Sequence, residues 1–522
     1  MMKQATALGP ACSTGDDMRY ALTAEQMRAV EDRAVVEGVA TLGELMRRAG
    51  EALADEVLSS APDGPVAVVC GPGNNGGDGW VAAHRLHEAG RECVVLCLRA
   101  PSELGGVARS AAEAAVESGI RWELAGGPAD ALVSNAAVVV DAVFGFGFKG
   151  PPEGVSALVL DAIATSGAFV VSADVPSGVN ADTGAVAGPA VRADVTVTFT
   201  APKPGLLLYP GAEHAGRVLV AEIGIPVGWT DVPGALEVPD ATDLRAAFPW
   251  PGPQDHKGSR GRVAILAGST TYPGAAVLAA RGALRMGPGF TVVVVPEPVA
   301  DIVRAAAPNA LVRAVPAGPD GTVSSVTACV EAVSDADAVV AGPGLTTGGV
   351  VSELVGRLIA EAPAPLVLDA DALNALPSGM ESLGEREAPL IVTPHPGEAA
   401  RILGVPTPSI QSDRVTAAVS MCGPQAVCLL KGARTIVASS TRRAVVVAGN
   451  AGLARAGSGD VLSGMLGALL AHRVPAFDAA VLGAFLHGRA AEHGTRRLTV
   501  TCFTSADITD HLPDAVRDVT GE

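Results

Sequence analysis

The sequence is short of aromatic and basic residues, and both shortages limit what the protein can be. Only 3% of its 522 residues are Phe, Trp or Tyr, so the core must be built mainly from Ala, Val and Leu. Lys and Arg number 37 against 55 Asp and Glu, which gives a formal net charge of −18. An acidic chain disfavours a broad nucleic-acid interface or an anionic membrane surface, because both attract basic faces. We therefore expect neither nucleic acid nor membrane as a partner.

Paired cysteines, long apolar runs and a signal peptide are also missing. The eight cysteines are scattered without a C-x-x-C pair, which favours reduced thiols over a disulfide framework or a zinc site. No uncharged apolar run approaches the roughly 18 residues of a membrane span. The first 20 residues lack the apolar core of a signal peptide. We expect a cytoplasmic protein in which residues 1–17 are a disordered leader and Met18 is a candidate start.

Glycine and proline are abundant instead, with 62 and 38 residues beside 48% hydrophobic residues. Short β-branched runs alternate with Ala-rich segments of helix length. This pattern is typical of a parallel sheet covered on both faces. In the first half we expect helices over residues 81–89 and 107–118, and strands over residues 66–70, 93–98, 136–140, 169–173, 195–200 and 218–223.

A proline-rich stretch at residues 248–254 (FPWPGPQ) divides the chain. It cannot lie inside a helix or a central strand. We expect an α/β protein with a boundary near residue 240: an N-terminal, Rossmann-like doubly wound domain at 18–240 and a second α/β domain at 241–522. The second set of expected strands is at residues 262–267, 291–295, 338–341, 366–368, 390–392, 427–430 and 444–447.

The first strand leads into a glycine-rich loop, in which Gly71, Gly73 and Gly76 form G-x-G-x-x-G. Such glycines allow the backbone to approach a phosphate at a helix N-terminus. However, the second strand ends without the acid that holds a ribose in a standard dehydrogenase. Residues 74–78 are also more polar than a pyrophosphate loop needs. The alternative interpretation is a tight turn whose glycines serve geometry only.

Two later strands also end in polar loops, at residues 141–150 and 174–178. Asp141 or Asp174 alone would more often be a helix cap or a turn residue. Ligands of open α/β sheets bind outside the carboxyl ends of the strands. Three polar loops at successive strand ends therefore favour a binding site.

Together, NNGGDG (74–79), DAVFGFGFKG (141–150) and DVPSG (174–178) resemble the epimerase domain of NAD(P)H-hydrate repair enzymes. Residues 22–27 (LTAEQM) and 200–205 (TAPKPG) extend the resemblance, which covers about residues 20–235. It implies that the loops bind the hydrated dinucleotide through Asn74, Asn75, Gly76, Gly77, Asp78, Gly145, Phe146, Gly147, Phe148, Lys149, Gly150 and Pro151.

The resemblance also implies catalytic and metal-binding residues. Asp174 would contact the hydrated nicotinamide ring, and epimerisation would use Asp174 and Lys149 for proton transfer, with the division of roles open. Asn75, Asp141 and Ser177 would supply oxygens to a potassium ion. The same fold occurs as a non-catalytic binding module, but Asp174 together with the glycine-rich loop favours the enzyme.

The second half carries a glycine-rich segment at residues 449–459 that leads directly into an apolar helix. Free N–H groups at a helix start stabilise a migrating phosphoryl group. Asp460, in the first turn, can take a proton from an attacking hydroxyl. The alternative is that Asp460 only caps the helix. The segment is not a Walker A loop, because no G-K-[ST] follows.

Further polar residues follow expected strands, at residues 342–345, 368–373, 393–398 and 431–435. His395 is either a ligand contact or an ordinary loop histidine. Asp371 and Glu398 are either turn residues or part of a metal shell.

These motifs, with residues 256–261 (HKGSRG) and 272–276 (YPGAA), look like the ADP-dependent NAD(P)H-hydrate dehydratase domain of the ribokinase-like superfamily. The resemblance implies an α/β/α sandwich in which Ala275, Gly344, His395 and Asp460 bind the hydrated substrate. The adenine nucleotide would be bound by Lys431, Gly432, Ala433, Arg434, Thr435, Asn450, Gly457, Ser458 and Gly459.

This sequence departs from that family where it has Leu453, Arg455 and AGSGD (456–460) instead of Met, Thr and GGTGD. Ser458 still offers a hydroxyl, and Arg455 would add a cation near the phosphates. The family therefore implies retained activity, with the affinity for nucleotide in question.

Taken as a whole, the resemblance implies a bifunctional metabolite-repair enzyme. The first domain would interconvert the R and S epimers of hydrated NADH and NADPH. The second would phosphorylate the S epimer with ADP, with magnesium, and phosphate loss would regenerate the dinucleotide and leave AMP. One rival is a ribokinase-like small-alcohol kinase fused to a non-catalytic domain. Another is a scaffold that binds nucleotide without turnover. The oligomeric state is open, with a homo-oligomer as one alternative.

Overall fold

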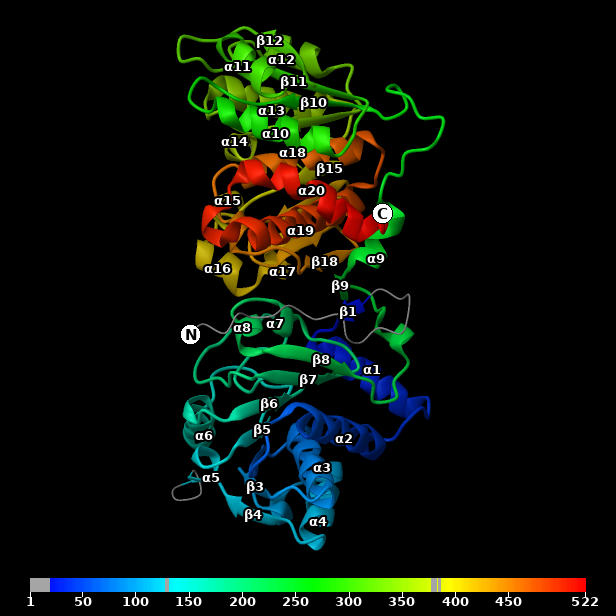
Figure 1. Cartoon of the computed structure of the whole chain (residues 1–522), viewed down its shortest axis with the longest axis vertical. Helices are drawn as coiled ribbons and strands as arrows, with labels where there is room; N and C mark the ends of the chain where they lie inside the picture. Colours follow the sequence, from blue (N-terminus) through cyan, green and yellow to red (C-terminus); the bar gives the residue numbers. More distant parts are fainter. Residues whose placement is uncertain (1–18, 127–130, 377–382, 384–385) are drawn as a thin grey trace. The chain divides into compact units, whose positions relative to one another are not determined.

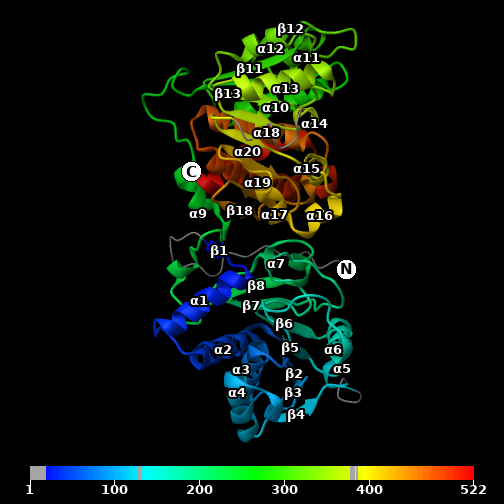
Figure 2. The same cartoon turned by 180° about the vertical axis from the view of Figure 1, so that it is seen from behind.

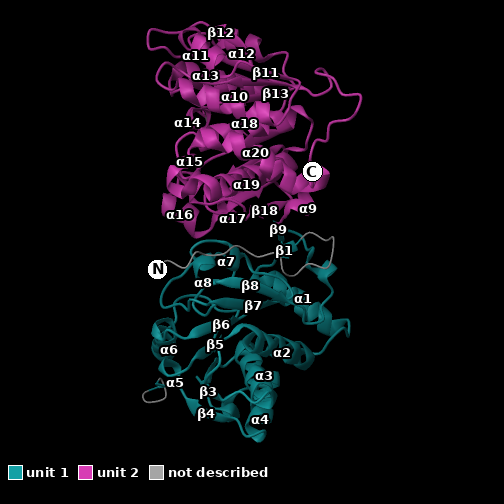
Figure 3. Cartoon of the chain, in the orientation of Figure 1, with its two compact units in different colours: residues 1–237 teal, residues 238–522 magenta. Residues whose placement is uncertain are grey.

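The computed structural model describes residues 19–126, 131–376, 383 and 386–522 (Figure 1). The expected leader at residues 1–17 lies outside this part of the chain. Two compact units divide the chain, residues 1–237 and residues 238–522 (Figure 3). None of the described helices is long and apolar enough to cross a membrane.

The sheet of unit 1 has the order β4-β3-β2-β5-β6-β7-β8, and every neighbouring pair is parallel. The strand order reverses beside β2, so the sheet is doubly wound as predicted. Its strands are β2 (Val66–Cys70), β3 (Cys93–Cys97), β4 (Arg121–Leu124), β5 (Val138–Ala142), β6 (Phe169–Ala173), β7 (Val195–Phe199) and β8 (Arg217–Ala221). The short strands β1 (Arg19–Ala21) and β9 (Leu236–Val238) are not part of this sheet.

Helices cover both faces of this sheet (Figures 1 and 2). Successive residues of β2 point to opposite faces, because Val68 packs in one buried cluster with α2 and α3 while Val69 packs in another with α6. The helices are α1 (Ala24–Val36), α2 (Leu42–Ser60), α3 (Asn74–Glu88), α4 (Gly106–Glu117), α5 (Ala131–Ser134), α6 (Gly154–Thr165), α7 (Pro204–Leu207) and α8 (Gly211–His214).

Two of the boundary differences from the prediction in unit 1 fall at residues of the predicted site. The helix expected at residues 81–89 begins at Asn74, because the glycine run forms its first turns. The strand expected at residues 136–140 is β5, Val138–Ala142, so Asp141 lies inside the strand. A buried carboxylate is tolerated there because the neighbouring strand and loop supply hydrogen-bond donors.

Unit 2 is built on a sheet that runs β18-β17-β16-β15-β14-β13-β10-β11-β12. Its pairs are parallel except β16 with β17 and β17 with β18. The prediction lacked β12 and β17. The strands are β10 (Arg262–Leu266), β11 (Phe290–Pro296), β12 (Leu311–Val315), β13 (Ala338–Ala341), β14 (Leu366–Leu368), β15 (Leu390–Val392), β16 (Ala426–Leu430), β17 (Thr435–Ala438) and β18 (Arg443–Val446).

Helices of unit 2 lie between and beside these strands. They are α9 (Ala241–Leu244), α10 (Pro273–Arg285), α11 (Ala300–Ala306), α12 (Val326–Val333), α13 (Gly349–Glu361), α14 (Asp371–Asn374), α15 (Pro396–Leu403), α16 (Thr407–Ser412), α17 (Arg414–Val419), α18 (Ser458–Ala471), α19 (Ala476–Cys502) and α20 (Ser505–Thr520).

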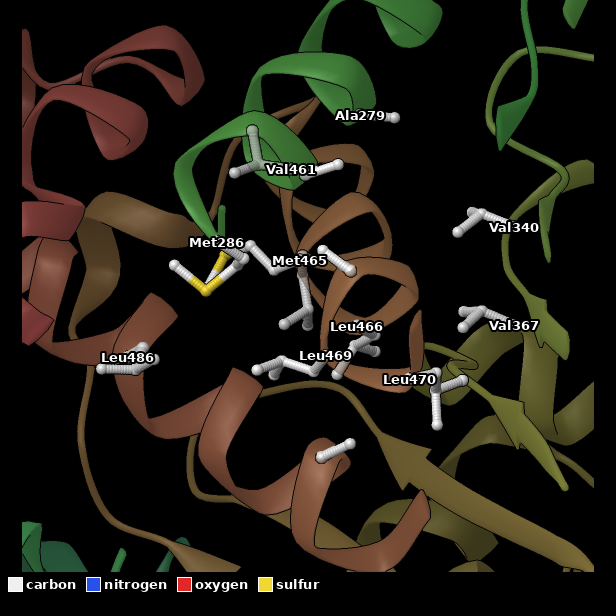
Figure 4. Close-up of a cluster of buried hydrophobic side chains, with 14 of the residues drawn as sticks. Ala279, Met286, Val340, Val367, Val461, Met465, Leu466, Leu469, Leu470 and Leu486 are labelled. Atoms are coloured by element: carbon white, nitrogen blue, oxygen red, sulfur yellow. The ribbon is translucent and has the colours of Figure 1, made fainter. Parts of the chain in front are cut away.

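The core of unit 2 is organised around α18, which is buried from Val461 to Ala471. Figure 4 shows Met465, Leu466 and Leu469 of α18 among side chains from α10, α19 and the sheet. A helix that is apolar all round must be buried in this way. Because its whole length is held in the core, the position of its first turn, which carries Asp460, is fixed.

Candidate functional sites

A cavity of about 580 Å³ in unit 1 is lined by residues that follow β2, β5 and β6, together with residues of α1 and α2. The three polar loops that were predicted to converge therefore line one cavity. Of the predicted residues, those that line the cavity are Asn74, Asn75, Asp78, Gly145, Phe146, Gly147, Phe148 and Asp174. Gly76, Gly77, Lys149, Gly150 and Pro151 are not part of its lining.

Gly76 and Gly77 serve close packing instead of facing the cavity. A Cβ atom on Gly76 would lie 1.9 Å from the carbonyl oxygen of Gly71, and one on Gly77 would lie 2.4 Å from Met46 Cε. The interpretation of the glycines as a requirement of geometry thus holds for these two. Their polar neighbours Asn75 and Asp78 line the cavity. The loop therefore packs closely through its glycines and also contributes polar side chains to the cavity.

Asp174 is held in a dense set of contacts. Its backbone has a φ of 64°, and the residue is only 3% exposed. Oδ1 forms an ion pair with Lys203 Nζ and accepts a hydrogen bond from Thr198 Oγ1 at 3.3 Å. Oδ2 accepts the Phe146 N–H at 2.9 Å. Asp174 is therefore fixed in position at the cavity wall.

The lysine beside Asp174 is Lys203, whereas the prediction named Lys149. Lys149 is exposed, on a loop that leaves the cavity wall. Lys203 is 1% exposed and donates to Thr198 Oγ1 at 3.0 Å and Phe199 O at 3.1 Å in addition to its ion pair. Lys203 lies in the TAPKPG segment, but its sequence position gave no sign of its contact with Asp174.

Three other acids, Glu31, Asp32 and Asp78, line the same cavity. Burial raises the pKa of Glu31 to about 7, with Asp174 adding to the rise and Lys203 opposing it. Burial also raises the pKa of Asp78 well above its ordinary value, and the charges of Asp174 and Glu31 contribute. Glu31 was absent from the prediction, because a glutamate on an amphipathic helix carries no motif.

Of the three residues expected to bind a cation, Asn75 lines the cavity, whereas Asp141 and Ser177 are not part of its lining. Asp141 is fully buried, and its carboxylate accepts from Ser177 Oγ at 2.6 Å, Ser177 N at 2.9 Å and Ser172 Oγ at 2.8 Å. Asn75 Oδ1 lies 3.0 Å from where a Cβ on Gly145 would be, and its Nδ2 is buried without a hydrogen-bond partner in the described structure. The atoms with which Asn75, Asp141 and Ser177 would coordinate a cation are oxygens, and oxygen ligands fit a hard cation.

In unit 2, Asp460 lies in the first turn of α18, after Gly457 in the left-handed region at φ 90°. Burial raises its pKa to about 6; Asp369 adds to this rise and Lys431 opposes it. The backbone N–H groups of a helix start favour negative charge at this point. The site thus combines a proton acceptor with a place for a phosphoryl group.

Lys431 pairs with carboxylates beside this turn. Its Nζ lies 2.6 Å from Asp369 Oδ1 and 3.9 Å from Glu398 Oε2. A Cβ on Gly459 would lie 3.3 Å from the same Nζ. Asp369, which lies in the predicted segment 368–373 but was given no role, is 1% exposed and also accepts from Thr393 Oγ1 at 2.8 Å. Lys431 was predicted to bind nucleotide. In the structure its ammonium group forms ion pairs with two acids beside the first turn of α18.

His395 caps α15 and is half-exposed. Its Nδ1 accepts the N–H groups of Gly397 and Glu398 at 3.0 and 3.3 Å, and its Nε2 lies 3.3 Å from Glu398 Oε1. Burial raises the pKa of Glu398, and Lys431 opposes the rise. Asp371 accepts the Thr346 N–H at 2.8 Å and thereby joins two strand-end loops.

Ala275 and Gly344, which come from separate motifs, lie side by side. Gly344 has a φ of 65°, and a Cβ there would lie 2.9 Å from Ala275 Cβ and 2.8 Å from Tyr272 Cβ. Glycine is therefore required at 344 both by the backbone and by the close approach.

The polar side chains of the predicted nucleotide segments are bonded mostly to the protein itself. Ser458 Oγ donates to Leu453 O at 2.8 Å, and Asn450 Nδ2 donates to Thr495 Oγ1 at 2.7 Å. Arg434 donates to Val447 O, while Thr435 begins β17. Gly432 has a φ of 137°, and a Cβ there would lie 3.0 Å from the Arg414 guanidinium. Ala433 lies between them on this turn.

Arg455 is tied to the end of α19, since its guanidinium donates to the carbonyls of Val500 and Thr501. His487, which the prediction lacked, lies buried with Nε2 2.9 Å from Ser458 O. Because a carbonyl only accepts, this nitrogen carries the proton. Burial lowers the pKa of His487 to about 4, so it supports the start of α18 as a neutral donor.

Comparison with known proteins places both units in one family. Residues 263–514 match the family model described as NAD(P)H-hydrate dehydratase, and residues 42–205 match the one described as YjeF-related protein N-terminus. A bifunctional NAD(P)H-hydrate repair enzyme of Moorella thermoacetica is 36% identical over 517 residues, which cover 96% of this chain and 98% of the relative. The chain belongs to the family of bifunctional NAD(P)H-hydrate repair enzymes.

A second relative agrees with this membership. The repair enzyme of Thermofilum pendens is 38% identical over 86% of this chain and 87% of its own length. A solved structure of the ADP/ATP-dependent NAD(P)H-hydrate dehydratase of Bacillus subtilis, co-crystallised with ATP and Mg²⁺, is 31% identical. It covers 54% of this chain and 97% of that chain, with a TM-score of 0.46. Each family model matches a segment within one unit: residues 42–205 lie in unit 1 and residues 263–514 lie in unit 2.

Proposed function

We propose that unit 1 epimerises hydrated NADH and NADPH, and that unit 2 dehydrates the S epimer at the expense of ADP, giving AMP and phosphate. The observation that carries this proposal is the similarity along 96% of the chain to a relative named as a bifunctional NAD(P)H-hydrate repair enzyme. Each unit also contains its own acidic site, around Asp174 and around Asp460. The alternative function, a small-alcohol kinase fused to a non-catalytic domain, explains only the second of these sites.

In unit 2, the reaction begins at Asp460. Its carboxylate takes the proton of the ring hydroxyl while that oxygen attacks the terminal phosphoryl group of ADP. The N–H groups at the start of α18 stabilise the charge that develops on the phosphoryl oxygens. Phosphorylation converts hydroxide, a poor leaving group, into phosphate. Loss of phosphate and a ring proton then regenerates the reduced dinucleotide.

Magnesium fits the same site. Mg²⁺ is commonly bound through one or two carboxylates together with substrate phosphates. Glu398, buried beside Lys431 and Asp369, is the carboxylate that would hold it. When bound, the ion would neutralise charge on the phosphates.

In unit 1, Asp174 would contact the hydrated nicotinamide ring, while the cavity loops hold the rest of the dinucleotide. Asn75, Asp141 and Ser177 would hold a potassium ion, which when bound would add positive charge near the substrate. Lys149, which is exposed, is left without a proposed role in proton transfer.

Purified protein given mixed hydrate epimers with ADP or with ATP tests the proposal. We expect the absorbance of the reduced nicotinamide to return, with stoichiometric phosphate and AMP from ADP. A stable phosphorylated product would favour a small-alcohol kinase, and nucleotide binding without turnover would favour a scaffold. A reaction without nucleotide is the control.

Potassium is tested on epimerisation alone. Because the proposed ligands are oxygens only, we expect the rate to fall when sodium replaces potassium at equal ionic strength. Treatment with a chelator of transition metals should leave the rate unchanged. Equal kcat and KM in sodium and potassium would count against this cation site.

A further inference from the structure

The cavity of unit 1 is lined by two acids that none of the predicted motifs includes, Glu31 and Asp32, of which Asp32 is exposed. Glu31 belongs to α1, lines the cavity, and is half-buried. It forms no hydrogen bond or ion pair with any residue in the described part of the chain. An unpaired carboxyl group at the wall of a binding cavity is free to act on what the cavity holds.

Asp174, in contrast, is not free. Both of its carboxylate oxygens already accept hydrogen bonds, and one of them is paired with the buried ammonium of Lys203. Lys203 in turn uses its three N–H bonds on Asp174, Thr198 and Phe199. This arrangement holds the Asp174 carboxylate in place beside a buried cation, with both oxygens already engaged.

We propose that Glu31 is the proton donor and acceptor of epimerisation and that Asp174 stabilises the cationic intermediate. The inference rests on the proposed epimerase function of unit 1. Glu31 gives its proton to the ring hydroxyl; the C–O bond breaks, its electron pair leaves with water, and the lone pair of the ring nitrogen forms a C=N bond. The ring is then a cation, which the fixed charge of Asp174 favours.

Inversion is completed from the other face of the ring. A water molecule forms a new C–O bond there, the C=N electrons return to nitrogen, and the surplus proton passes to bulk water. Glu31 regains a proton from solvent. One hydroxyl is lost and one gained, so the product differs from the substrate only in configuration. The reverse direction follows the same steps backward, with Glu31 accepting the proton.

The surroundings of Glu31 suit a group that both gives and takes a proton. Burial raises its pKa to about 7, while Lys203 and Arg28 lower it and Asp174 and Asp32 raise it. Asp78 also faces Glu31. Because Asp78 is buried, the ionised form that would remain after it gave up a proton is strongly disfavoured. Glu31 thus changes charge near neutral pH.

The test compares Glu31→Gln with Glu25→Gln, an exposed glutamate at the start of the same helix that does not line the cavity. We expect kcat for epimerisation to fall by about 10²–10⁴-fold in Glu31→Gln with little change in KM. Glu25→Gln should match the wild type. Dehydration of pure S epimer with ADP should be unchanged in both variants.

The pH profile separates chemistry from structure. The wild-type epimerisation rate should be highest below pH 7 and fall above it. In one direction the protonated form of Glu31 is lost, and in the other the proton that the departing hydroxyl takes from bulk water becomes scarcer. This fall should be absent from the residual activity of Glu31→Gln and retained in Glu31→Asp. A wild-type rate that is flat across this range overturns the proposal even if Glu31→Gln does not fold.

Other outcomes separate this proposal from the function on which it rests. A wild-type protein that dehydrates the S epimer but never interconverts the epimers would overturn the epimerase function itself. An active wild type with a Glu31→Gln rate close to its own would overturn only the role of Glu31.

Discussion

At the scale of single residues, Asp460 shows how neighbours set the pH at which a base can work. Burial and Asp369 raise its pKa to about 6, so its carboxylate form is present above that pH and lost as the pH falls. We therefore expect dehydration to slow progressively below pH 6. A dehydration rate that is constant from pH 7 to pH 5 would contradict Asp460 as the base.

Asp460→Asn should abolish AMP release while epimerisation continues. The amide keeps the size of the side chain and much of its ability to cap a helix, so folding should survive. Losing a general base costs about 10²–10⁴-fold in rate. Asp301→Asn, in the first turn of α11 and exposed, is the matched control. Near-normal AMP release would demote Asp460 to a helix cap.

Lys203 is a second residue whose removal has a clear expected result. Lys203→Met would leave the buried Asp174 carboxylate without its cation, which typically costs about 3–5 kcal/mol. We expect unit 1 to lose that much stability in denaturant unfolding. The double variant Lys203→Met/Asp174→Asn should regain part of it, because no unpaired charge remains. Equal losses in the single and double variants would refute this account.

At the scale of elements, α18 is held against α10 and against β13 by glycines. A Cβ on Gly464 would lie 1.9 Å from Ala279 O, and one on Gly467 would lie 2.2 Å from Val340 Cγ2. Gly464→Ala should therefore destabilise unit 2 by about 1–3 kcal/mol and shift the start of α18, which carries Asp460.

Gly274→Ala in α10 is the control, because no atom lies within 4 Å of the added Cβ. That substitution should be neutral or stabilising, since alanine favours helix over glycine. Thermal unfolding and AMP release measure both variants. A Gly464→Ala protein as stable as the control would show that α18 can move away without cost.

At the scale of the whole molecule, the two units should function when separated. Each has its own sheet, its own buried clusters and its own candidate site. Residues 18–240 expressed alone should epimerise the hydrates, and residues 241–522 should dehydrate the S epimer. If neither fragment folds, or each loses its reaction, the division of activities between the units is wrong.

Much of this architecture was predictable from sequence. Buried parallel strands read as short β-branched runs, and β2, β6, β13, β14 and β15 lie where those runs predicted them. Glycine-rich loops at strand ends also carry a local signal, so the segments around Asn75, Asp174 and Asp460 could be found. Such features depend on neighbours in the chain, and the sequence alone determines them.

Tertiary structure decided which side chains meet. Lys203 is 29 residues from Asp174, and Lys431 is 62 residues from Asp369, so no spacing links either pair. Glu31 reaches the cavity only because α1 packs beside loops more than 40 residues away. Lys149 lies in the motif at residues 141–150, but its side chain is exposed. Proton affinity follows from burial and nearby charge, and these quantities exist only once the chain has folded.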